Sequence, residues 1–182
     1  MRSADNNERG DLMSRALHSE VAEHELATLL IPITSGQWVL PNVSVAEIIS
    51  YTQVQPLALA PDWLLGTIEW RKLRVPLLAV EQLNGVGGAT SVAGSRIAVL
   101  NGLNGDSRLP FFALVISAPP RLMRILPDEI ANAPGPELGP CDLCSVLVIG
   151  ERAIIPNIDY IEGQLLDIVD SIISSTIEPV GN

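Results

Sequence analysis

The sequence predicts a mainly β protein with minor α content, and three observations lead to that prediction. From Leu26 onward, short apolar runs are separated by Gly, Pro, Asn and Ser at close intervals, as in antiparallel barrels and sandwiches. A glycine-rich stretch at residues 84–95 divides this pattern into two comparable halves. Apolar side chains recur at helical spacing after residue 157, so we expect one helix packed against the β body.

The composition favours a folded protein that does not bind nucleic acid. Apolar residue types make up 47% of the 182 residues and charged types 18%, which supplies enough apolar side chain to offset chain entropy. The 21 acidic residues outnumber the 11 basic residues, so the formal net charge is −10. This charge repels a nucleic-acid backbone, and we expect no nucleic-acid partner.

The first 25 residues are expected to form a flexible leader. They are polar and mixed in charge, without the uninterrupted apolar core of a signal peptide, so we expect a cytoplasmic protein. The apolar run at residues 26–33 is far below the ~20 residues that a membrane helix needs. The sequence therefore predicts no direct membrane insertion.

The first β half is expected over residues 26–84. Its strands are predicted at residues 26–33, 38–40, 67–71 and 74–80. A turn at residues 34–37 joins the first two strands as a hairpin, and a loop bounded by Pro56 and Pro61 precedes the third. The sequence therefore predicts a small antiparallel β unit for this half.

The second β half is expected over residues 96–158, after a linker at residues 85–95. Its strands are predicted at residues 96–100, 111–117, 145–149 and 153–155. The closing helix is expected at about residues 159–173, because Ile161, Leu165, Ile168 or Val169, and Ile172 recur at helical spacing. Asn157 or Asp159 could cap it, and the whole domain would span residues 26–174.

A search for catalytic chemistry finds no complete motif. Cys141 and Cys144 have the spacing of a redox or zinc pair, but no second pair accompanies them and they precede a strand. His18 and His24 both lie in the leader, so neither is placed as a general base on a rigid scaffold. We expect no catalytic residue, metal or cofactor. A small thiol or metal enzyme that uses the two cysteines is the alternative.

Three local features are not explained by a plain core. The bases Arg71, Lys72 and Arg74 gather within four positions. Trp63 and Trp70 bracket Gly66, which places large amphipathic rings beside a position where another backbone can approach closely. Glu47 shares an otherwise apolar strand face with Val43 and Val45, and such an acid needs a partner. We expect Trp63 and Trp70 in a protein-binding surface, although both could equally belong to the core.

Several of these residues belong to a recognisable pattern. Residues 61–71, continuing to residues 75–78, resemble the central signature of CheW-like chemotaxis coupling proteins. In that signature a small-residue loop, an apolar-apolar-Gly step, an Arg and a Val-x-Pro-Val-type strand follow in order. Residues 29–40 resemble the opening hairpin of the family, and residues 43–49 resemble its Val-x-Glu-Ile element. The resemblance covers about residues 26–170.

The resemblance implies a fold and a function. The fold would be two small five-stranded β-barrels that share a core. The function would be that of a non-catalytic adaptor, which couples chemoreceptors (methyl-accepting proteins) to a CheA-type histidine kinase in chemosensory signalling. The implied partners are the cytoplasmic tip of the receptor and the regulatory domain of the kinase. The protein would then reach membrane-associated receptor arrays through these partners.

The resemblance also implies site residues. Val43, Val45, Glu47, Gly66 and Arg71 would lie at or near a receptor-facing surface, where Glu47 pairs with Arg71. A guanidinium can hold a carboxylate by two parallel N–H···O bonds, and we expect that two-pronged geometry for the pair.

The chain departs from the family pattern at three positions. Lys72 stands where a glycine usually follows the arginine, and Ala79 and Ser117 stand where aspartates are usual. Residues 40–47 and 70–76 look especially similar to ChpC-like accessory adaptors of chemosensory systems that control type IV pili and twitching motility. A structural subunit of pilus assembly, which would use its sheets only for packing, is a further alternative.

Overall fold

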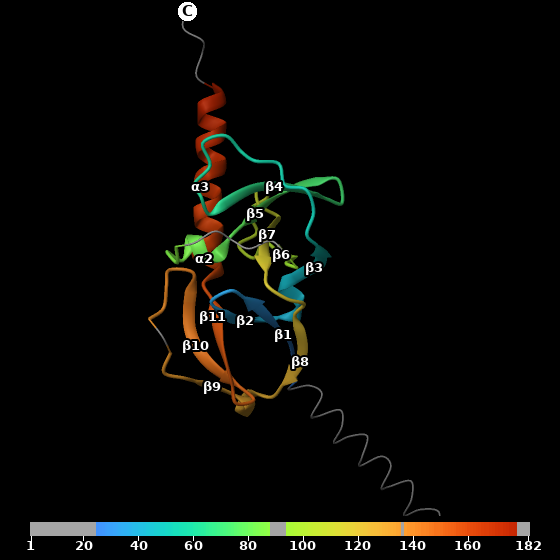
Figure 1. The fold of residues 1–182 in the computed structure, drawn as a ribbon, viewed down its shortest axis with the longest axis vertical. Helices are drawn as coiled ribbons and strands as arrows, with labels where there is room; N and C mark the ends of the chain where they lie inside the picture. The colour runs from blue at the N-terminus through green and yellow to red at the C-terminus, as the bar shows by residue number, and fades with distance from the viewer. Residues whose placement is uncertain (1–24, 88–93, 136, 178–182) are drawn as a thin grey trace, which may run out of the picture.

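The computed structural model describes residues 25–87, 94–135 and 137–177, and it shows a mainly β body with one long helix (Figure 1). The strands are β1 (Leu26–Ile33), β2 (Gly36–Pro41), β3 (Val45–Ser50), β4 (Leu64–Trp70), β5 (Leu73–Leu78), β6 (Arg96–Asn101), β7 (Phe111–Ile116), β8 (Arg121–Ile125), β9 (Ile130–Asn132), β10 (Asp142–Val148) and β11 (Glu151–Pro156). The helices are α2 (Val80–Leu83) and α3 (Ile158–Ile177), with single 3-10 turns η1 (Asn42–Ser44) and η2 (Pro127–Glu129). The leader prediction falls, except for residue 25, outside the described residues, as does the middle of the predicted linker.

The strands form two sheets. One has six strands in the order β8-β1-β2-β11-β10-β9, and the other has five in the order β3-β6-β7-β5-β4. The first sheet therefore has one strand more than expected. The mainly antiparallel pairing includes two parallel contacts, β11 with β2 and β5 with β7.

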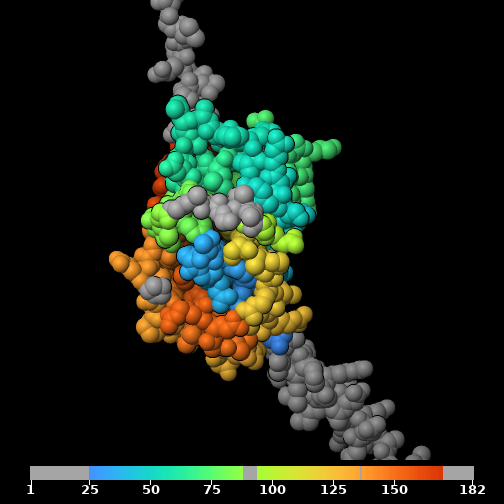
Figure 2. Space-filling view, in the orientation of Figure 1, coloured from blue at the N-terminus to red at the C-terminus, as the bar shows by residue number. Residues whose placement is uncertain are grey.

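The two predicted halves of the chain, residues 26–84 and 96–158, do not correspond to the two sheets. The six-stranded sheet combines β1 and β2 with β8 to β11, whereas β3 to β7 make the other sheet. Figure 2 shows the same arrangement, because blue residues from the N-terminal hairpin lie among yellow and orange residues from the far end of the chain. Turn signals show where strands end, but they do not show which distant strand completes a sheet.

Both sheets curl on themselves. β8 and β9 are the edges of the six-stranded sheet, yet only η2 separates them in the chain. Met123 of β8 and Ile130 of β9 pack against one apolar cluster, which also contains Leu30, Val39 and Val146. The five-stranded sheet likewise encloses a cluster to which both of its edge strands contribute. Each sheet therefore has an interior of its own.

A third apolar cluster joins the two sheets. In β6, Ile97 and Val99 face the interior of the five-stranded sheet, whereas Ala98 and Leu100 face the shared cluster. β1 alternates in the same way, with Leu30 facing one cluster and its neighbours the other. Successive side chains of a strand point to opposite faces, so a strand buried on both faces must be apolar throughout. This explains the unbroken apolar runs in the sequence.

α3 completes the shared cluster. Ile161 and Leu165 are buried in it, as the helical spacing predicts. Asn157 caps the helix, because its side-chain Oδ1 accepts the N–H of Tyr160 at 3.2 Å. In the described part of the chain, neither helix has the length and apolar character that a membrane crossing requires.

Candidate functional site

The carboxylate of Glu47 lies at the centre of a polar cluster on the five-stranded sheet. Its Oε2 accepts a hydrogen bond from Trp70 Nε1 at 3.0 Å and another from Arg71 Nη2 at 2.9 Å. The guanidinium carbon of Arg71 lies 4.5 Å from the centre of the Trp70 ring, close enough for a cation–π contact. We call Glu47, Trp70 and Arg71 the clasp.

The clasp joins the two edges of its sheet. Glu47 lies on β3 and Trp70 on β4, which are at opposite ends of the strand order. A bulge between Val45 and Glu47 shifts the register of β3 against β6 at this point. Because a bulge redirects the side chains beside it, it accounts for an acid on an otherwise apolar strand. The clasp therefore links the two edge strands through side-chain contacts.

Each member of the clasp has a different exposure. Trp70 is buried, and its ring meets the ring of Phe111 edge-on, with centroids 4.9 Å apart and planes at 65°. The side chains of Arg71 and Glu47 retain 65% and 41% of their accessible surface. The buried indole thus supports a charged pair that remains exposed to solvent.

The predicted pairing of Glu47 with Arg71 is present, but the two-pronged geometry is wrong. A single oxygen of Glu47 accepts both the guanidinium and the indole N–H. Sequence reasoning missed the indole as a partner of Glu47. The contact could have been predicted from the sequence, because a buried tryptophan N–H needs an acceptor and the acid Glu47 needs a donor.

Arg71 and Lys72 form the tip of the β4–β5 hairpin. Trp70 pairs with Leu73, and the two residues between them have φ angles of 49° and 65°. Positive φ at both central positions defines a type I′ turn, whose twist matches that of the flanking strands. Glycine adopts this conformation without strain, which gives a physical reason for the glycine that the family pattern has in place of Lys72.

We therefore expect Lys72→Gly to stabilise the fold. The left-handed conformation costs a non-glycine residue about 1–2 kcal/mol, and the freedom of glycine in the unfolded chain offsets about half of that gain. The melting temperature should rise by roughly 1–4 °C, measured by calorimetry. Lys72→Ala is the control, because alanine keeps the strain. An equal rise in the alanine variant would show that the lysine charge, rather than the backbone, is responsible.

Gly66 has a structural role within β4. Its φ is +137°, and a Cβ built on it would lie 2.2 Å from the carbonyl oxygen of Gln55. Gln55 and Thr67 exchange two backbone hydrogen bonds of 2.8 Å beside it. The loop that leads into β4 therefore occupies the space beside Gly66 that a side chain would fill. The glycine is explained by this contact within the chain, without a binding partner.

The remaining predicted residues lie apart from the clasp. Val43 is 81% exposed in η1, and its carbonyl accepts a hydrogen bond from Asn101 Nδ2 at 2.8 Å. Val45 and Trp63 are half-buried and pack against the shared cluster. Of the seven predicted residues, the structure gathers only Glu47, Trp70 and Arg71 around one contact. Trp63 contributes to packing, as the core interpretation expects.

The two cysteines differ in environment. Cys141 is fully buried in the shared cluster, and burial, with the nearby charge of Asp142, raises the pKa of its thiol to about 12. Cys144 is half-buried on β10. No group of three or more His, Cys, Asp or Glu side chains that could hold a metal occurs among the described residues.

We expect the two thiols to react differently with iodoacetamide at pH 8. A pKa of about 12 leaves roughly one Cys141 thiol in 10⁴ ionised at this pH, and the side chain is fully buried, whereas Cys144 is partly exposed. Peptide mass spectrometry of the native protein should find alkylated Cys144 and unmodified Cys141. In denaturant both should react. Comparable labelling of Cys141 in the native protein would contradict its burial.

Comparisons with known proteins bear on both fold and family. A family model described as CheW-like domain matches residues 27–161. A crystal structure of the scaffolding protein TtCheW from Thermoanaerobacter tengcongensis superposes with a TM-score of 0.60 at 16% identity, covering 72% of this chain and 88% of that one. No curated protein sequence matches the chain. The structural likeness confirms the predicted fold class.

Proposed function

This chain belongs to the CheW-like family, and we propose that it is a non-catalytic adaptor that couples chemoreceptors to a CheA-type histidine kinase. The clasp is the observation that supports a binding role at a defined place. It presents an exposed guanidinium and carboxylate on a support of buried aromatic rings. Charged groups that are held in position lose less entropy on binding than free ones, so such a surface suits protein recognition.

The clasp is proposed as a contact for one signalling partner. The family resemblance favours the cytoplasmic tip of the receptor as this partner and adds the exposed Val43, which is nearby in the chain, to the contact. Arg71 uses one N–H group on Glu47, and a guanidinium carries five. The others are available to a carboxylate or carbonyl of the partner. The kinase could instead be the partner that contacts the clasp, and titration with its regulatory domain tests this alternative.

We further propose a place in a system that controls type IV pili. The support is the similarity of residues 40–47 and 70–76 to ChpC-like adaptors. Glu47, Trp70 and Arg71, which form the clasp, all fall within these two segments. The alternative of a thiol enzyme is disfavoured, because burial and the raised pKa of Cys141 oppose thiolate chemistry.

A reconstitution tests the adaptor function. The protein, a receptor cytoplasmic fragment and the kinase regulatory domain, all from the source organism, are mixed pairwise and together and separated by size-exclusion chromatography. The proposal expects both pairwise complexes and a ternary complex. Absence of binding to either partner would overturn coupling. Deletion of the gene should reduce twitching, and unchanged twitching would overturn only the pilus assignment.

A further inference from the structure

An asparagine is followed directly by a glycine at three places in the sequence, residues 84–85, 101–102 and 104–105. At such a step the backbone nitrogen of the glycine can attack the side-chain carbonyl carbon of the asparagine and expel ammonia. Glycine favours the reaction because it has no Cβ to hinder the approach and its backbone rotates freely. The asparagine side chain must also be able to turn, and the glycine N–H must not be held by a hydrogen bond. The tertiary structure therefore decides which of the three steps can react.

The step at residues 84–85 is held on both sides of the reacting bond. The Oδ1 of Asn84 accepts the backbone N–H of Cys141 at 2.8 Å, and its Nδ2 donates to Oδ2 of Asp142 at 2.7 Å. The N–H of Gly85 donates to the carbonyl of Gln82 at 3.1 Å. All three hydrogen bonds must break before the glycine nitrogen can reach the asparagine side chain, so this step is protected.

The step at residues 101–102 is protected in the same way. Asn101 is the last residue of β6, and its Nδ2 donates to the carbonyl of Val43 at 2.8 Å. The N–H of Gly102 donates to the carbonyl of Pro110 at 2.8 Å. A Cβ built on Gly102 would lie 2.2 Å from the carbonyl oxygen of Leu109, so the backbone is packed closely here. The glycine therefore has no room to rotate toward the asparagine side chain.

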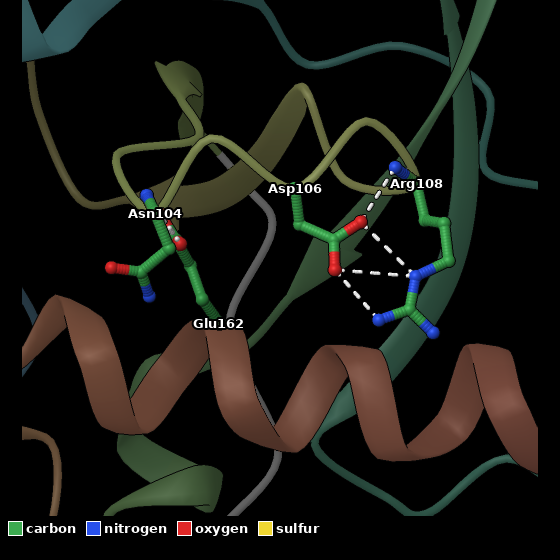
Figure 3. A network of polar contacts seen from close by, with 4 residues as sticks. All are labelled: Asn104, Asp106, Arg108 and Glu162. Atoms are coloured by element: carbon green, nitrogen blue, oxygen red, sulfur yellow. Dashed lines mark hydrogen bonds and ion pairs between the residues drawn. The ribbon is translucent and has the colours of Figure 1, made fainter.

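The step at residues 104–105 is open. Both residues are exposed in the loop between β6 and β7. Within the described part of the chain, neither the side-chain amide of Asn104 nor the N–H of Gly105 forms a hydrogen bond. A Cβ built on Gly105 would meet nothing within 4 Å, so the backbone has room to rotate. Figure 3 shows the side chain of Asn104 directed away from Asp106 and Arg108.

Asn104 also lies where a new charge affects the fold. Its backbone N–H donates to Oε2 of Glu162 at 3.1 Å, and the N–H of Leu103 donates to Oε1 at 2.6 Å. Glu162 is buried on α3, so these two bonds hold the loop against the helix. In the same loop, Arg108 donates hydrogen bonds to Asp106 and lowers the pKa of that carboxyl to about 2, so Asp106 is ionised at neutral pH (Figure 3). A carboxylate at position 104 would be added to these acids.

We propose that Asn104 is a site of spontaneous deamidation, and that this modification loosens the β6–β7 loop from α3. The nitrogen of Gly105 gives its proton to solvent and bonds to Cγ of Asn104, while the Cγ–Nδ2 bond breaks and ammonia leaves. Water then opens the resulting imide ring. Opening at Cγ gives aspartate, and opening at the main-chain carbonyl gives isoaspartate. Isoaspartate adds a methylene to the main chain, between the N–H that Glu162 accepts and the Asp106–Arg108 contact.

Mass spectrometry of the full chain after incubation at 37 °C and pH 8 tests the site. Trypsin releases residues 97–108 as one peptide, so fragment ions compare Asn101 and Asn104 within the same molecule. Deamidation, seen as a gain of about 1 Da, should be at least about tenfold faster at Asn104, because the hydrogen bonds at residues 101–102 must first break. In a synthetic peptide of residues 97–108 the two sites should react at comparable rates.

Three results would overturn the assignment of the site. They are equal rates at Asn101 and Asn104 in the folded protein, no reaction at Asn104, and the same preference for Asn104 in the synthetic peptide. The last result would mean that the local sequence, rather than the fold, selects the site.

The effect on the fold is tested with the aged protein. After incubation the wild type should melt lower by roughly 2–4 °C, and the N–H groups of Leu103 and Asn104 should exchange faster with solvent. Asn104→Gln is the control, because glutamine keeps the amide but would have to close a larger ring. Its aged and fresh samples should melt alike. Asn104→Asp adds the charge without the methylene and should melt between the fresh and the aged wild type.

Loosening of the loop is contradicted if the wild type converts at Asn104 and yet keeps its melting temperature and its hydrogen exchange. An equal fall in the aged Asn104→Gln variant would place the damage elsewhere in the chain and contradict the proposal as well. Both experiments use the protein alone, so their outcome is independent of the adaptor function.

Discussion

Substitution of Gly66 by alanine is expected to lower the free energy of unfolding by about 3–5 kcal/mol, because two costs combine. The backbone angle φ of +137° is strained for any residue with a Cβ. The new methyl group would also lie 2.2 Å from the carbonyl oxygen of Gln55, so the loop must move. That movement breaks the two hydrogen bonds between Gln55 and Thr67, which hold the loop against β4.

Calorimetry should record this loss as a fall in melting temperature of roughly 6–20 °C, given about 2–4 °C per kcal/mol for a domain of this size. Gly85→Ala is the matched control. Gly85 also has a positive φ, +80°, but a Cβ there would meet nothing within 4 Å. Its substitution should cost about 1 kcal/mol from backbone strain alone. Equal losses in the two variants would mean that the close approach of Gln55 to Gly66 does not exist in solution.

The second large effect is expected on binding at the clasp. Arg71→Ala and Glu47→Ala should each lower the affinity for the partner that docks at the clasp by at least tenfold. A tenfold loss corresponds to about 1.4 kcal/mol of binding free energy. Removal of one charge from a contact that becomes desolvated leaves the other unpaired, at a cost of about 2–5 kcal/mol. The double variant should be little worse than either single one, since both losses come from one interaction.

Stability should respond differently from binding. Arg71→Ala removes an exposed ion pair worth about 0.2–1 kcal/mol, so its melting temperature should stay close to that of the wild type. Glu47→Ala also removes the acceptor of the buried Trp70 N–H, and the orphaned donor costs about 1–3 kcal/mol. Trp70→Phe, which removes the donor at the cost of a smaller core side chain, should therefore lose less stability in the Glu47→Ala background than in the wild type.

Isothermal titration with the receptor fragment and with the kinase domain identifies the partner. Arg124→Ala, an exposed arginine of the six-stranded sheet, is the control for a general change in charge. Unchanged affinity for both partners in both single variants would place the contact elsewhere. Fully additive losses would mean that Glu47 and Arg71 act separately.

The sequence by itself determined the local structure and much of the site. Alternation of turn residues with short apolar runs predicted most of the strands but missed β8 and β9, because an apolar run bounded by Gly and Pro favours a strand over a helix and these two segments carry no such run. The recurrence of apolar residues after Asn157 predicted α3, and the recognisable pattern around Trp70 and Arg71 pointed to the pairing with Glu47. Each of these signals is carried by residues close together in the chain.

The tertiary structure alone decided the features that depend on distant segments. β1 is completed by β8, and β2 by β11, because their side chains together enclose one cluster, and no local signal specifies such a pairing. The indole of Trp70 became the second donor to Glu47 only when the sheet brought its edge strands together. Gly66 proved to make room for the chain's own loop. These outcomes depend on which surfaces bury one another, and burial is a property of the whole fold.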